Sequence, residues 1–110
     1  IIPPHLKSVL ERKVRAVQVP CITPAGLLER LKVSAEDLEL LVIDAEGFDL
    51  AVLRPFMAME GFAPSQVKFE WVNLEHRWTA LMQTLQDLAA MGYNVRQEHF
   101  DLVAVNTRYF

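Results

Sequence analysis

Three carboxylates follow two short runs of large apolar residues. Asp44 and Glu46 come directly after the aliphatic run Leu40–Ile43. Glu70 lies near the end of a second apolar stretch, which begins at Gln66. Runs of this length and composition are typical of strands buried on both faces of a parallel sheet. Because ligands bind at the carboxyl ends of such strands, we expect the three acids to meet at one site if the two strands are neighbours.

Clustered carboxylates can accept a proton as a general base or hold a hard cation such as Mg²⁺. We therefore identify Asp44, Glu46 and Glu70 as candidate catalytic residues, with Asp44 and Glu70 as candidate metal ligands. His76, a short loop beyond Glu70, is a fourth candidate, as base or ligand. The structural alternative is that Asp44 caps the following helix and Glu46 interacts with its dipole. Asp49, one turn further, is expected to be solvated.

Length and composition limit the class of protein. The 110 residues are enough for a single α/β domain with a modest core. The formal net charge of −3, without a Lys/Arg cluster, argues against a nucleic-acid partner. The apolar runs are too short to cross a membrane. Cys21 is the only cysteine, which excludes an intrachain disulfide and makes a reducing, cytoplasmic location the default expectation.

Hydrophobic spacing and turn residues predict an alternation of strands and helices. A strand is expected at Val14–Val19, a helix opens at Thr23-Pro24, and the helix after Asp44 begins near Glu46 and ends near Arg54, before Pro55. The remaining predicted elements are a helix at His5–Lys13, strands at Leu40–Ile43 and Gln66–Val72, a helix from Trp78 to Ala89 closed by Gly92, and a strand pair at Asn94–Gln97 and Leu102–Asn106. The pattern from Val14 onward is β-α-β-α-β-α-β-β, an α/β sheet that ends in an antiparallel hairpin.

The segment Ile43–Asp49 resembles the IDxEGxD/E signature of the FkbM-type methyltransferases, which use S-adenosylmethionine to methylate hydroxyl groups. Further segments resemble the family in the same order along the chain: Val19–Thr23 with Leu27-Leu28, Val67–Glu70, Gly92-Tyr93 and Asp101–Val105. The resemblance covers most of this chain and the later half of the family's domain. One departure is Pro24-Ala25, where the family usually places an acidic residue shortly after the threonine.

The resemblance implies a mainly parallel, Rossmann-like methyltransferase sheet and a small-molecule or glycan hydroxyl as acceptor. It also implies two earlier strands with a glycine-rich cofactor loop, which this chain lacks. Its four glycines (Gly26, Gly47, Gly61 and Gly92) are too far apart for such a loop, so no cofactor-binding residue is identified. We therefore expect the substrate-side part of a methyltransferase, with the isolated chain catalytically silent.

The sequence is also compatible with two other functions. The first is a non-catalytic α/β module that associates with proteins. An exposed edge of its sheet would be covered either by another chain, as in a homodimer, or by the segment Val14–Val19. The second is a small hydrolase that depends on Mg²⁺ or Mn²⁺ bound by the carboxylates.

Overall fold

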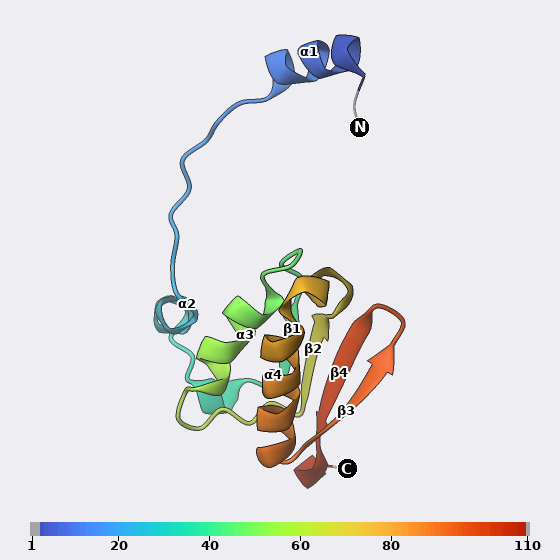
Figure 1. Ribbon diagram of the computed structural model, residues 1–110. Coiled ribbons are helices and arrows are strands. Elements are labelled where there is room, and N and C mark those ends of the chain that lie inside the picture. The colour runs from blue at the N-terminus through green and yellow to red at the C-terminus, as the bar shows by residue number, and fades with distance from the viewer. Residues whose placement is uncertain (1–2, 110) are drawn as a thin grey trace.

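The computed structural model describes residues 3–109, except for the side chains of Asn73, Glu75 and His76. Within this range the chain forms helices and strands that alternate through its central part (Figure 1). The helices are α1 (Pro4–Lys13), α2 (Pro24–Leu31), α3 (Asp49–Met57) and α4 (Trp78–Ala90), with short 3-10 helices η1 (Ala35–Asp37), η2 (Val72–Arg77) and η3 (Thr107–Tyr109). The strands are β1 (Leu40–Ile43), β2 (Gln66–Glu70), β3 (Tyr93–Glu98) and β4 (Asp101–Asn106).

The four strands form one mixed sheet in the order β1-β2-β4-β3. Strand β1 is parallel to β2, with Leu40 opposite Gln66 and Ile43 opposite Phe69. Strand β4 is antiparallel to both β2 and β3. The α/β class and the closing hairpin are confirmed. A mainly parallel sheet is not confirmed, because only one of the three strand pairs in the described part of the chain is parallel.

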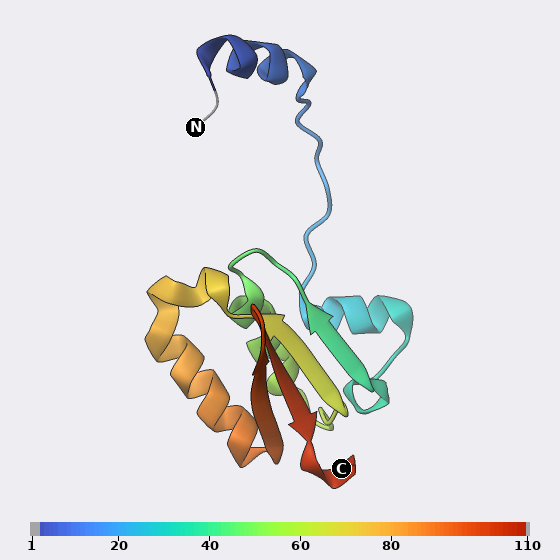
Figure 2. The same cartoon turned by 90° about the vertical axis from the view of Figure 1, so that its right-hand side faces the viewer.

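Helices α3 and α4 cover one face of the sheet and form the core with it (Figure 1). Val67 and Phe69 of β2 point into this core and are fully buried, together with Leu53 of α3 and Leu88 of α4. Strand residues alternate between faces, so the neighbours of Val67 and Phe69 point to the other side. Figure 2 shows that other face, which no helix of the described chain crosses.

The predicted strand Val14–Val19 is wrong. Residues 14–23 have no regular secondary structure, and Val14, Val17 and Val19 are each more than 70% exposed. Strands need a partner for their backbone groups, and this segment runs away from the sheet to the separate helix α1 (Figures 1 and 2). The Cα radius of gyration is 17.4 Å, whereas a compact domain of this length has about 13 Å. We refer to residues 3–23 as the arm and residues 24–109 as the body.

The helix predictions are confirmed in part. Helix α2 opens as expected, since the Thr23 hydroxyl accepts a hydrogen bond of 3.0 Å from the Gly26 amide. Helix α4 matches its apolar spacing. Helix α3 begins three residues later than predicted and does not end before Pro55 but includes it. Pro55 is exposed, and the buried Leu53 and Phe56 on either side hold the helix against the core.

Across residues 3–109, none of the helices combines the length and the apolar character that crossing a bilayer requires.

Candidate functional site

A tight turn between β1 and α3 presents the first acidic residues. The Phe48 amide donates to the Ala45 carbonyl at 3.1 Å, which closes a four-residue turn. Its two central residues, Glu46 and Gly47, both have positive φ angles, 48° and 99°. Glycine adopts this conformation without steric cost, whereas Glu46 is held in it by the turn. The guanidinium of Arg77 lies 5.8 Å from the centre of the Phe48 ring and links the turn to η2.

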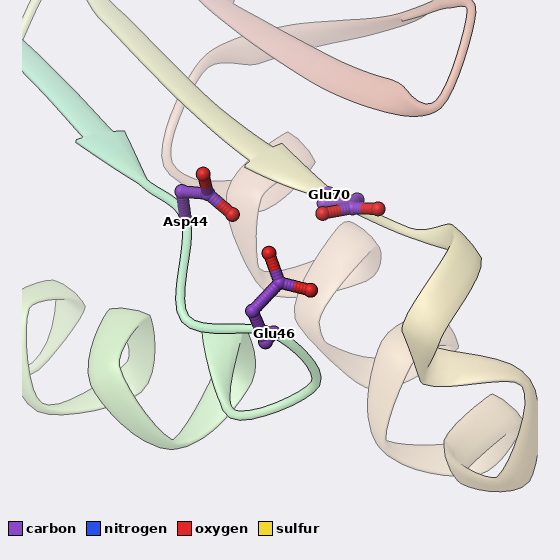
Figure 3. Close-up of side chains that lie close together, drawn as sticks. All are labelled: Asp44, Glu46 and Glu70. Carbon is purple, nitrogen blue, oxygen red and sulfur yellow. The ribbon is translucent and has the colours of Figure 1, made fainter. Parts of the chain in front are cut away.

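The turn and the end of β2 bring three carboxylates together, as the sequence predicted (Figure 3). Asp44 follows β1, Glu46 lies in the turn, and Glu70 is the last residue of the neighbouring parallel strand. One ligand atom from each residue lies within 4.8 Å of the other two. Asp44 and Glu46 are exposed and Glu70 is half-buried, so the cluster is open to a ligand from solvent.

Asp49 fixes the turn relative to β2. Its side chain is fully buried, so the prediction that it is solvated is wrong. One carboxylate oxygen accepts a hydrogen bond of 3.2 Å from the Ala45 amide, and the other accepts one of 3.0 Å from the Glu70 amide. Asp49 thereby ties the turn that carries Glu46 to the residue that completes the cluster. The sequence feature that indicates this role is the position of Asp49 in the first turn of α3, where an acidic side chain can accept a hydrogen bond from a backbone amide near the start of the helix.

The structural alternative for Asp44 is wrong. The position before the first residue of α3 is Phe48, and no side chain caps the helix there. Asp44 instead projects toward Glu46 and Glu70, beside the end of β1 (Figure 3). Asp44 therefore does not cap helix α3, whereas the interaction of Glu46 with the helix dipole stays a prediction. The stabilising carboxylate at this helix is Asp49, through the Ala45 amide.

Glu70 lies in an environment that favours its protonated form. Partial burial raises the pKa of its carboxyl group above the ordinary value of 4.5, and the charges of Glu46, Asp44, Asp49 and Asp101 raise it further. Asp101 lies opposite Glu70 on strand β4 and pairs with Lys68 at 3.5 Å. A carboxylate with a raised pKa binds a proton more strongly, which suits it to act as a general base.

The cluster also has dimensions close to those of a cation site. Opposite oxygen ligands are about 4.6–5.2 Å apart around Ca²⁺ and about 4.0–4.2 Å apart around Mg²⁺. An upper bound of 4.8 Å between the three ligand atoms is compatible with a shared hard cation and does not distinguish between the two ions.

Two further predictions concern His76 and the cofactor. His76 belongs to η2, but its side chain lies outside the described residues, so its role stays a prediction. The four glycines lie apart from one another: Gly26 is in α2, Gly47 is in the turn after β1, and Gly61 and Gly92 lie in separate turns. The described residues therefore include no glycine-rich loop.

These features define an α/β protein with an acidic cluster at the carboxyl ends of two parallel strands, the position where α/β enzymes bind ligands. Residues 3–95 match the protein family described as the methyltransferase FkbM domain. The chain belongs to this family, which confirms the resemblance seen in its motifs. Membership implies use of S-adenosylmethionine in general. Comparison with curated proteins and with solved structures gave no match.

Proposed function

We propose that this chain forms the acceptor side of an S-adenosylmethionine-dependent O-methyltransferase. In this proposal Glu70 is the general base for the acceptor hydroxyl, and Asp44 and Glu46 orient that hydroxyl. The observation that carries the proposal is the convergence of these three side chains within 4.8 Å at the carboxyl ends of β1 and β2. Family membership supplies the reaction class.

The chemistry follows from the charges at this site. A hydroxyl group becomes a stronger nucleophile as it loses its proton, and Glu70 would accept that proton. Burial and the neighbouring carboxylates raise the pKa of Glu70, which favours it as the base. Asp44 and Glu46 are exposed and can accept hydrogen bonds from other hydroxyls of a small molecule or glycan. When bound, the cofactor supplies a methyl group on a cationic sulfur, which an acidic site attracts.

The proposal assigns no cofactor-binding residue, because none of the described residues forms a glycine-rich loop. We therefore expect the purified chain to transfer no methyl groups alone. A cytoplasmic setting, in which the single Cys21 stays reduced, remains our expectation. The alternative, a non-catalytic module of the same family, differs in having no affinity for hydroxylated ligands at the acidic cluster.

A divalent cation is the competing role for the same carboxylates. It would lower the pKa of the acceptor hydroxyl directly, so that Glu70 would act as a ligand and not as a base. Thermal unfolding with Mg²⁺, Mn²⁺ or Ca²⁺ separates the two roles. A midpoint that rises with the cation, and that no longer rises in Glu70→Gln, favours the metal role. An unchanged midpoint favours the base.

The acceptor site is tested by NMR with a set of small alcohols, polyols and monosaccharides. We expect the hydroxylated ligands that bind to shift the amides of residues 44–47 and of Glu70. Glu70→Gln should weaken this binding, whereas Glu98→Gln should not. Glu98 is a matched control, because its exposed carboxylate lies at the same end of the sheet as Glu70, two strands away on β3, and pairs with Arg96 at 3.2 Å.

Calorimetry with S-adenosylhomocysteine, with and without Mg²⁺, tests the cofactor side separately. A dissociation constant tighter than about 100 μM, or roughly −5.5 kcal/mol, would mean that the chain holds the cofactor, either alone or across a dimer. Methyl transfer by the purified chain would contradict the expectation that it is inactive alone. Ligands that bind only away from the acidic cluster would contradict the acceptor site itself.

A further inference from the structure

Strand β1 has an open, apolar edge. It lies at the end of the sheet and pairs only with β2, so the backbone groups along its other side have no strand partner in the described chain. Natural edge strands are usually protected by charged residues, proline or a bulge. The four residues of β1 are all aliphatic, and Leu40 and Val42 are 60% and 57% exposed. This edge is therefore suited to the addition of another strand.

The arm contains a segment with the properties of the missing strand. Residues 14–19 read Val-Arg-Ala-Val-Gln-Val, with valine on both faces of an extended chain. Paired with β1, this segment would place valine beside the exposed Leu40 and Val42 on one face of the sheet and valine on the face that carries the core, so the pattern fits the position. Val14, Val17 and Val19 are 72–76% exposed and are not covered by the body of their own chain. The arm leaves the start of α2 and extends away from the body (Figures 1 and 2).

Charge selects the direction of pairing. The carboxyl end of β1 leads into the acidic cluster of Asp44, Glu46 and Glu70. The amino-terminal side of the arm segment is basic, with Arg12, Lys13 and Arg15. Only antiparallel pairing brings these cations next to the cluster, where opposite charges attract.

We propose that two copies of this chain associate by exchanging arms, with residues Val14–Val19 of each copy pairing antiparallel to β1 of the other. The exchange buries two apolar surfaces that each copy exposes alone and makes the same contact twice, as two-fold symmetry requires. It also places Arg15 of one copy beside the acidic cluster of the other. The proposal does not depend on the proposed methyltransferase function.

The test is the mass of the full chain by light scattering and sedimentation, from micromolar to near-millimolar concentration. We expect a monomer–dimer equilibrium. Val17→Pro removes a backbone donor from the added strand and should raise the dissociation constant about 100-fold or more. Val17→Thr is the matched control, because it keeps the donor and the β-branched shape. Val17 is exposed and outside the body, so neither change should unfold the protein.

Salt and charge reversal test the direction of pairing. We expect added salt and Arg15→Glu to weaken the dimer. A dimer indifferent to both overturns the antiparallel arrangement. A chain that stays monomeric at every concentration overturns the proposal. If the amides of residues 14–19 in such a monomer are protected from exchange, the arm has docked on its own body, which also overturns the proposal. A dimer that survives Val17→Pro uses another interface and also overturns it.

Discussion

Substitution of Asp49 by alanine tests how the acidic site is held together. In the native chain this buried carboxylate accepts one hydrogen bond from the Ala45 amide and one from the Glu70 amide. Alanine removes both acceptors and leaves two amide donors without their partner. The turn that carries Glu46 then loses its connection to β2. We expect the substitution to destabilise the fold and to loosen the carboxylate cluster.

The magnitude follows from the two hydrogen bonds. Each bond to a charged group contributes about 1.5–3 kcal/mol to the free energy of unfolding, so the pair contributes about 3–6 kcal/mol. Removal of a buried charge also relieves its cost of desolvation, which offsets part of this sum. We therefore expect a loss of about 3 kcal/mol, which corresponds to a fall of about 10–20 °C in the unfolding midpoint for a domain of this size.

The assay combines denaturant unfolding with amide hydrogen exchange. Asp37→Ala is the matched control: Asp37 also accepts two hydrogen bonds, from the Ser34 amide and hydroxyl, but it is exposed. Its loss should cost only about 1 kcal/mol. In Asp49→Ala, protection of the Glu70 amide should fall further than that of Phe69, its neighbour in the same strand. If Glu70 and Phe69 lose protection equally, or if both variants cost the same, the reasoning is refuted.

Two further predictions concern pH and the core. Because the pKa of Glu70 is raised in the folded chain, the folded state binds its proton more strongly than the unfolded state does. The stability that this proton contributes is fully present below about pH 4.5 and is lost as pH rises through the raised pKa. Glu70→Gln should therefore gain stability relative to the native chain as pH rises, and a constant difference in unfolding free energy across that range would contradict this. Tyr93 donates a hydrogen bond of 2.6 Å to the buried Pro64 carbonyl, so Tyr93→Phe should cost about 1–2 kcal/mol. Unfolding in urea measures this cost, and a neutral substitution would show that the bond contributes nothing net.

The sequence predicted the centre of the fold for physical reasons that are local. The aliphatic run of β1 and the apolar residues of β2 specify two strands, and their last residues identify the end of the sheet where Asp44 and Glu70 meet. The expected burial of β1 on both faces is wrong, because Leu40 and Val42 are exposed. The apolar period of α4 likewise needs only one face to pack against. These are the elements that the structure reproduces.

The predictions that failed depend on tertiary partners. Val14–Val19 has the composition of a strand, but a strand forms only where another strand accepts its hydrogen bonds. Asp49 looks like a surface residue by type, and its burial follows from the Ala45 amide four residues earlier and the Glu70 amide on the neighbouring strand. Pro55 would end an isolated helix, yet burial of Leu53 and Phe56 maintains α3 around it. In each case the deciding contact comes from the tertiary packing, which the residue types alone do not specify.

The central claim is that Asp44, Glu46 and Glu70 act as one electrostatic unit with Glu70 as its base. An NMR titration of the Glu70 side-chain carboxyl carbon measures this directly. The account predicts a pKa above 4.5 in the native chain, with a shift back toward that value in Asp44→Asn and Glu46→Gln. An ordinary pKa in the native chain, or one that neither substitution changes, would contradict it.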